Sequence, residues 1–267
     1  MVRMDWDALT RELDAWAEAE RVLPLWWRDD DAAKPLPALA TLLEMADALQ
    51  VEVGLAVIPV LAGKALATDL ARRPKVVVLQ HGYAHRNHAT DGERAIECGG
   101  ARPLEEVLDE LRRGRQRLAQ FFDARFAPIL AAPWNRIDAA VAVRLGECGF
   151  AGLSTFGPRA QQARPPGLAV ANAHVDPLNW RNGGRFAGLH KALSGIIGEM
   201  RARRRRESDP DEPLGLLTHH LQHDSATWAF LERFLDVTQR HPAVGWLNVA
   251  EAFGSAALSG RSAEEPA

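Results

Sequence analysis

The stretch KVVVLQHGYAHRNH, residues 75–88, decides the fold class that we expect for this chain. Its first half is a run of β-branched and aliphatic residues, 76–79, without polar alternation. Strands that are buried on both faces have this pattern, and they are typical of parallel sheets covered by helices. The run ends abruptly in His81 and His85. The stretch therefore predicts a buried parallel strand whose carboxyl end carries polar, chemically active side chains.

Similar apolar runs alternate with amphipathic segments along the rest of the chain. We expect strands at residues 22–27, 51–57, 75–80, 129–132, 150–155, 168–173, 214–218 and 244–247. We expect helices at residues 6–16, 37–49, 60–71, 103–122, 137–148, 186–204 and 228–237. Such alternation predicts a parallel α/β fold, and no linker or shift in composition divides the chain. We therefore expect a single domain over residues 1–254 and a flexible tail at 255–267.

The composition is that of an ordinary globular protein of enzyme size. Apolar residues make up 47% of the 267 residues and charged residues 25%, which excludes a disordered chain and a collagen-like fibre. The net charge of −3 provides no basic field, so we expect no nucleic-acid partner. The two cysteines, Cys98 and Cys148, lack Cys-x-x-Cys partners and are interpreted as free thiols in a reducing compartment.

The N-terminal residues do not have the apolar core of a signal peptide, and no apolar run approaches the roughly 18 residues that a membrane span needs. We therefore expect a cytoplasmic protein without a membrane span. The basic run at residues 201–206 closes an expected helix. We interpret it as a solvated face, because cations are favourable at a helix C-terminus.

Polar clusters follow five of the expected strands. They are residues 29–31, the histidines at 81, 85 and 88, residues 134–136, His174 with Asp176, and residues 219–220. In a parallel β/α fold the carboxyl ends of the strands lie at one face, where active sites are built. We therefore expect these distant acids and histidines to converge on one pocket.

The clusters contain the donor types of a catalytic metal site. His81 and His85 are four residues apart, and Asp29 and Asp30 supply carboxylates. Two neutral imidazoles and a carboxylate are a usual ligand set for a divalent metal that keeps one position for water. The H-x-x-x-H pattern and the acidic triplet are each weak signals alone, because polar loops and helix caps also produce them. Their joint occurrence favours a metal site.

In order and spacing, these motifs resemble those of the polysaccharide deacetylase family, carbohydrate esterase family 4 with its NodB homology domain. The family motifs T-F-D-D-G and H-[ST]-x-x-H correspond here to residues 27–31 and 81–85. R-x-P-Y is matched in part by residues 131–134, the Asp and Trp pair by Asp176 and Trp180, and L-x-H by residues 217–219. The resemblance covers most of the chain and implies a distorted (β/α)7 barrel, a TIM-like fold with parallel strands.

The resemblance also implies roles for the matched acidic and histidine residues. Asp29 would be the general base that takes the proton of the attacking water. Asp30, His81 and His85 would bind one divalent metal ion, for which we expect zinc. The metal would polarise the amide carbonyl and lower the pKa of its water.

The remaining candidate residues would handle the leaving group and the substrate. His219 would protonate the leaving amine, and Asp176 would fix its tautomer. The backbone N–H near Trp134 would help to stabilise the oxyanion. Trp180 and Tyr83 complete the expected substrate contacts.

One family residue is missing from the third motif. The family places an arginine that orients the catalytic Asp where this chain has Ala131. Arg28 and Arg136 are the candidates to replace it. Neighbours on an extended strand point to opposite sides, so Arg28 is poorly placed to reach Asp29. We therefore expect Arg136 to contact Asp29.

The function that we expect is metal-dependent deacetylation of an N-acylated sugar or of a small molecule that contains one. The substrate could be a glycan or a smaller, even lipid-linked, amino sugar. Two alternatives stay open. The loss of the family arginine at Ala131 would suit a barrel that binds carbohydrate without turnover. The same scaffold could also carry a different C–N hydrolase, such as a metal-independent amidase for a cyclic ureide.

Overall fold

A ten-residue strand, β1 (Leu23–Ala32), runs through the middle of the computed structural model, which describes residues 5–159, 165 and 167–254. β1 pairs in parallel with three strands: β2 (Val53–Val57), β9 (Leu214–Thr218) and β10 (Val244–Trp246). Beyond β2 the parallel sheet continues through β3 (Val76–His81), β4 (Phe126–Ala131), β5 (Gly152–Ser154) and β6 (Ala169–Val170).

The sheet curls so that its two edges approach each other. A bridge between Phe156 and Ala173 extends the pairing of β5, and a bridge between Val175 and Leu216 joins the segment after β6 to β9. The result is a curled parallel half-barrel in one α/β domain, which confirms the predicted distorted (β/α)7 barrel. A short antiparallel hairpin, β7 (Leu178–Asn179) and β8 (Arg185–Phe186), follows this segment.

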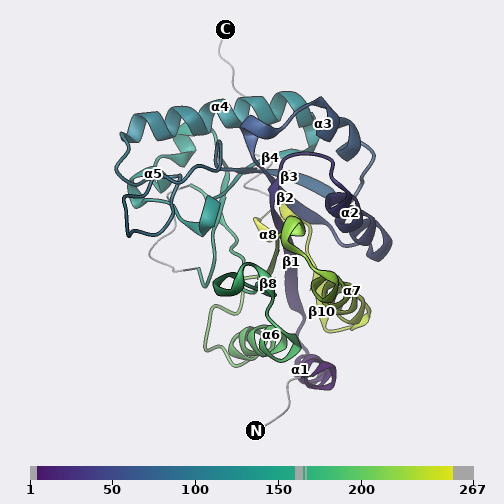
Figure 1. Cartoon of the computed structure of the whole chain (residues 1–267). Coiled ribbons are helices and arrows are strands. Elements are labelled where there is room, and N and C mark those ends of the chain that lie inside the picture. The colour runs from purple at the N-terminus through teal and green to yellow at the C-terminus, as the bar shows by residue number, and fades with distance from the viewer. Residues whose placement is uncertain (1–4, 160–164, 166, 255–267) are drawn as a thin grey trace.

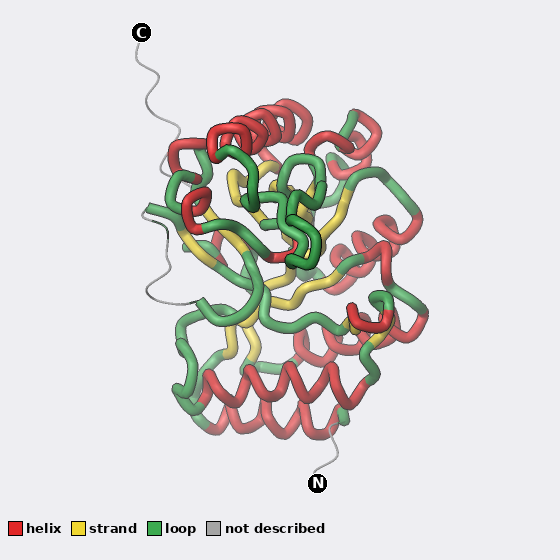
Figure 2. The backbone as a smooth tube through the Cα atoms, turned by 60° about the vertical axis from the view of Figure 1, so that its left-hand side comes forward, coloured by secondary structure: helices red, strands yellow, loops and turns green. Residues whose placement is uncertain are grey.

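Helices cover the outside of the curled sheet (Figures 1 and 2). They are α1 (Trp6–Glu18), α2 (Pro37–Leu49), α3 (Lys64–Leu70), α4 (Leu104–Phe122), α5 (Ala139–Ala142), α6 (Leu189–Arg204) and α7 (Ser225–Arg240), whereas the short helix α8 (Val249–Ala252) packs against the inner face. The Asp5 side chain caps α1 by accepting from the Ala8 N–H. The buried faces of α1, α2, α6 and α7 form one apolar core with the outer face of β1. Within the described residues, no helix has the length and apolar character needed to cross a bilayer.

The inside of the barrel is filled at one end. Trp26, Ile129 and Ala131 pack there against Phe253 and the neighbouring helix α8. Trp26 also donates its indole N–H to the carbonyl of Asn172 at 3.0 Å. These residues close one end of the barrel. The opposite end, which the carboxyl ends of the strands form, is therefore the open one.

The predicted elements agree with the structure at most positions. The predicted bounds of β9 and α2 match to the residue. The expected helix at 60–71 begins only at Lys64, and the expected helix at 137–148 is divided into α5 and a 3-10 turn at Leu145–Cys148. The β7–β8 hairpin was not predicted. The expected tail at 255–267 lies outside the described residues.

Candidate active site and metal centre

The alternation of side chains along β1 decides which acidic residues face the barrel interior. Trp26 lies in the apolar cluster inside the barrel, whereas Trp27 lies in the outer core beneath the helices. Because successive strand residues point to opposite faces, Arg28 and Asp30 share the inner face with Trp26. Asp29 shares the outer face with Trp27. The strand thus directs Asp30 toward the candidate site and Asp29 away from it.

Asp31 also faces this site because β1 ends irregularly. The register between β1 and β2 shifts between Asp29 and Ala32, and the φ angle of Asp31 is 70°. A bulge of this kind turns a side chain away from its regular direction, and Asp is among the residues that tolerate left-handed backbone. Consecutive residues Asp30 and Asp31 consequently line the same pocket of about 410 Å³.

Asp31, His81 and His85 form a compact set of metal-ligating side chains, the one set of three found in the described part of the chain. Their ligand atoms all lie within 4.8 Å of one another. Oδ1 of Asp31 is 3.2 Å from Nε2 of His81 and 3.3 Å from Nε2 of His85. Two imidazole nitrogens and a carboxylate oxygen suit a divalent ion such as zinc.

The surroundings of His81 prepare it for metal binding. Its Nδ1 is 3.0 Å from the carbonyl oxygen of Ala131. A carbonyl can only accept, so Nδ1 donates this bond and Nε2 is the ring nitrogen that would ligate a metal beside Asp31. Burial would lower the pKa of His81, but the carboxylates of Asp30 and Asp31 outweigh it and raise the pKa, so without a metal the protonated ring is favoured. For His85, burial and the neighbouring charge of His81 lower the pKa, which favours the neutral, ligating form. The residues therefore fit a divalent metal.

Asp30 was expected to join these histidines, but the structure places Asp31 there and pairs Asp30 with Arg28. Both members of this pair are buried, at 0% exposure for Arg28 and 2% for Asp30. Nε of Arg28 is 2.9 Å from Oδ1 of Asp30, and Nη2 donates to Oδ2 at 3.0 Å. The physical reason is strand geometry, because residues two apart on β1 share a face.

Neutral acceptors hold the rest of the Arg28 guanidinium. Nη1 donates to Oγ of Ser154 at 2.6 Å and to the carbonyl of Thr155 at 3.2 Å. Nη2 also donates to Oδ1 of Asn135. Among the residues that the structure describes, Asp30 is therefore the one carboxylate paired with Arg28, and the guanidinium fixes the orientation of that carboxylate.

Arg136 was expected to contact Asp29, and the structure places it elsewhere. Its Nη1 donates to the carbonyl of Ala95 at 2.7 Å, in the long loop after β3. The preceding residues Trp134 and Asn135 have φ angles of 52° and 57°, which redirect the chain after β4. Asp29, moreover, faces the opposite side of β1.

Asp29 forms a buried ion pair on the outer face of β1. Its oxygens accept from Oγ1 of Thr218 at 2.6 Å and from the backbone N–H of His220 at 3.1 Å. Nδ1 of His220 lies 2.5 Å from Oδ1. Burial alone would raise the pKa of Asp29, but the charge and hydrogen bond of His220 outweigh it and lower the pKa. The pair joins β1 to the end of β9.

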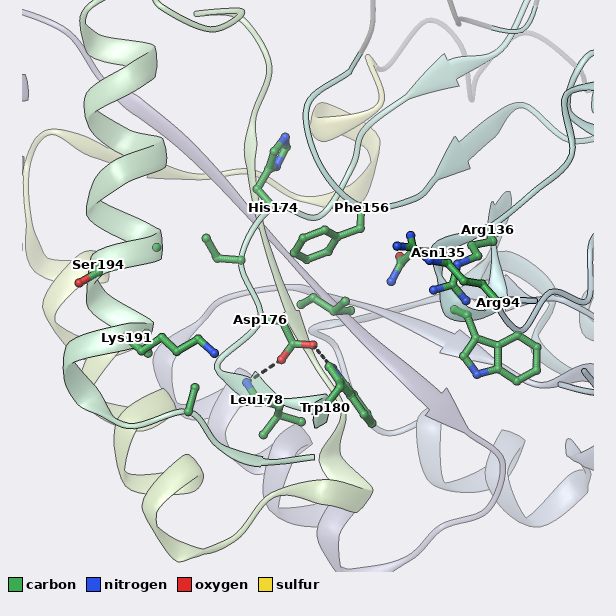
Figure 3. Close-up of a pocket in the computed structure, with 16 residues that line it drawn as sticks. Arg94, Asn135, Arg136, Phe156, His174, Asp176, Leu178, Trp180, Lys191 and Ser194 are labelled. Carbon is green, nitrogen blue, oxygen red and sulfur yellow. Dashed lines mark hydrogen bonds between the residues drawn. The ribbon is translucent and has the colours of Figure 1, made fainter. Parts of the chain in front are cut away.

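His219 lies between two carboxylates at the pocket wall. Its Nε2 is 4.0 Å from Oδ2 of Asp30, and its Nδ1 is 3.7 Å from Oδ2 of Asp176. The ring of Trp180 contacts His219 edge to face at 4.6 Å. Trp180 and the Leu178 N–H both donate to Asp176 at 2.8 Å (Figure 3). Burial raises the pKa of Asp176, although the charge of His219 and these hydrogen bonds act in the opposite direction.

Aromatic and amide side chains complete the pocket. It is lined by Asp30, Asp31, His81, His85, Trp134, Asn135, Arg136, Trp180 and His219. The ring of Trp134 packs on His85 with centroids 4.3 Å apart. Tyr83, which was expected to contact substrate, lies outside this lining, and its ring faces the guanidinium of Arg113 at 5.1 Å.

A buried carboxylate outside the pocket fixes the loop that follows His81 and carries His85. Glu97, 2% exposed, accepts from the backbone N–H groups of Tyr83 at 3.1 Å, Ala84 at 2.8 Å and Arg86 at 3.2 Å. Charge-assisted bonds of this kind are about twice as strong as neutral ones. The sequence carried no signal for Glu97, because its partners are backbone groups across a long loop.

Glu97→Gln is expected to weaken metal binding about 10- to 100-fold, the usual scale for residues that orient metal ligands. The substitution keeps the shape but removes the charge that three N–H groups share. Zinc affinity, measured by competition with a chromophoric chelator, checks this. Glu93→Gln, an exposed change in the same loop, is the matched control. Equal zinc affinity in both variants would show that Glu97 does not position the histidines.

Comparison with known proteins supports the fold. A scan against models of protein families finds no match, and a search of curated proteins finds none either. Solved structures do match. A protein assigned as a polysaccharide deacetylase, from Mycobacterium smegmatis, superposes with a TM-score of 0.64 at 18% identity, covering 92% of this chain and 95% of that one.

Two further matches carry the family 4 description. An acetyl xylan esterase from Clostridium thermocellum, in complex with a cobalt ion, has a TM-score of 0.50 at 11% identity over 86% of this chain and 90% of that one. A mutant of a CE4-family pseudoenzyme with restored enzymatic activity has a TM-score of 0.53 at 12% identity over 87% and 68%. The chain thus has the fold of carbohydrate esterase family 4, a fold found in both enzymes and a pseudoenzyme.

Proposed function

We propose that this protein is a metal-dependent deacetylase that hydrolyses the amide of an N-acylated amino sugar. One observation carries the proposal. A single pocket at the open end of the barrel is lined by Asp31, His81 and His85 and by Asp30, whose buried partner Arg28 lies behind it. This combination provides an oriented base beside three ligands for a divalent metal. The family 4 fold supports the same reaction class.

Asp31, His81 and His85 are the proposed ligands of one divalent ion, for which zinc is our candidate. When bound, such an ion supplies Lewis acidity and lowers the pKa of a water molecule toward neutrality. The protein's own contribution is the fixed tautomer of His81 and the bulge that presents Asp31. Asp31 takes the role that the sequence resemblance had given to Asp30.

Asp30 is the proposed general base, in place of Asp29. Its carboxylate borders the pocket, and Arg28 holds it in one orientation. The family's missing arginine is thus replaced from the same strand, two residues before the base. This replacement favours the enzyme over the alternative of a barrel that only binds carbohydrate.

His219 is the proposed acid that gives a proton to the leaving amine. Its Nε2 faces the pocket near Asp30, and Asp176 lies beside Nδ1. We propose that Asp176 orients the imidazole, while Trp180 supports both residues and offers its exposed ring to the sugar. The backbone N–H of Trp134 is our candidate for the oxyanion contact.

Acetate release tests the proposal. Purified protein loaded with zinc or cobalt should release acetate from N-acetylglucosamine derivatives, lose this activity with a chelator and regain it when the metal is restored. Removal of a catalytic Lewis acid is expected to reduce the rate to background. If the protein binds one equivalent of metal yet releases no acetate from mono- or oligosaccharides, the binding-barrel alternative is the better account.

A further inference from the structure

A second cavity, of about 870 Å³, adjoins the candidate active pocket. The two share the lining residues Trp134, Asn135, Arg136 and Trp180. Its size is within the range of about 300–1,000 Å³ that is common for small-molecule sites. A substrate with its amide beside Asp30 would therefore place its remaining part in this second cavity.

The charges that line this cavity are unbalanced. Arg94, Arg136 and Lys191 line it, and none of them forms an ion pair with any residue that the structure describes. Asp176 is the one carboxylate among the described lining residues, and it accepts hydrogen bonds from Trp180 and Leu178. The cavity therefore offers a net positive surface.

Two of the cations lie together at one end. Arg136 donates to the carbonyl of Ala95, the residue that follows Arg94 in the chain. Figure 3 shows Arg94 and Arg136 next to each other, with Lys191 on the opposite side of Asp176 and Trp180. Two guanidinium groups that line one cavity without a carboxylate partner among the described residues offer forked donors that suit a phosphate or a carboxylate.

Aromatic surface lies between the two ends of the cavity. Phe156 and Trp180 line it and are 45% and 50% exposed. Two open rings that line one cavity provide flat surfaces suited to pack against the apolar face of a sugar. The cavity thus offers a sugar platform beside a cationic end.

We propose that Arg94 and Arg136 bind the anionic group of the substrate, a phosphate or a carboxylate, so that the preferred substrate is a charged N-acylated amino sugar. This inference rests on the proposed function, because it names the substrate class of the same site. A neutral glycan chain would leave both guanidinium groups without an anionic partner among the described residues.

Binding to metal-free protein tests the inference without turnover. Calorimetry would compare N-acetylglucosamine 1-phosphate and N-acetylmuramic acid with the neutral methyl glycoside of N-acetylglucosamine. At least one anionic probe is expected to bind ten- to a hundredfold more tightly than the neutral one, the scale of a bidentate charged contact. The two anionic probes separate phosphate recognition from carboxylate recognition.

Substitutions locate the contact. Arg94→Gln, at an exposed residue, should remove most of the preference, and Arg136→Gln should do the same. Lys191→Gln, at the other end of the cavity, and Arg181→Gln, outside the lining, are matched controls for the loss of one charge. Equal binding of all three probes, or a preference lost in Lys191→Gln but kept in Arg94→Gln, would overturn the assignment.

Acetate release from the same probes separates this inference from the proposed function. Release from the neutral glycoside with no anionic preference in binding would keep the deacetylase and remove the anion site. A preference that depends on Arg94, without acetate release from any probe, would keep the anion site and contradict the deacetylase.

Discussion

Asp30→Asn is expected to retain its metal and to lose turnover by about 10²–10⁴-fold, the usual contribution of a general base. Asn has the shape of Asp and its carbonyl oxygen can still accept from Arg28, but it cannot take a proton at neutral pH. The rate of acetate release and the bound zinc per chain, measured on the same sample, check this. Circular dichroism establishes that the variant is folded.

Asp29→Asn is the matched control for this prediction. It removes the partner of the buried His220, and breaking such a pair costs about 3–5 kcal/mol of stability. We therefore expect a lower melting temperature, with turnover per folded molecule close to that of the unaltered protein. If Asp29→Asn loses turnover while Asp30→Asn keeps it, the base is Asp29 and the roles proposed here are exchanged.

Asp31→Asn should lose tight metal binding and, with it, activity. The substitution removes the one carboxylate among the proposed ligands, and a neutral amide is a poor ligand for zinc. Zinc affinity is expected to fall by at least about 100-fold, and excess metal should restore part of the activity. Equilibrium dialysis followed by metal analysis measures the affinity. Metal content equal to that of the unaltered protein would exclude Asp31 as a ligand.

The sequence was sufficient for the fold because the strands are apolar on both faces and end in polar residues. The runs at 76–79 and 214–218 have this pattern, and both are buried strands. The β7–β8 hairpin could not be predicted, because each of its strands is two residues long and carries no periodicity.

The candidate site was predictable in its position but not in its register. His81 and His85 lie together as expected, because they follow a strand that the sequence marks clearly. The triplet Asp29–Asp31 offers three chemically identical choices. Which of them faces the pocket depends on the phase of β1 and on the bulge at Asp31, and no local residue type reveals either.

The partner of the base illustrates the same limit. From the sequence, Arg28 is disfavoured as a partner of Asp29, because adjacent strand residues point to opposite sides. Once the base is placed at Asp30, the same alternation puts Arg28 on its face. An error of one residue in register therefore reverses the conclusion about the arginine.

A crystal structure of the zinc-loaded protein, with data collected at the zinc absorption edge, would show which side chains bind the metal. We expect one anomalous peak in the pocket, at about 2.0–2.2 Å from a carboxylate oxygen of Asp31 and from Nε2 of His81 and His85. Asp30 should remain paired with Arg28. A peak ligated by Asp30 or Asp29, or the absence of any peak beside the two histidines, would contradict the account.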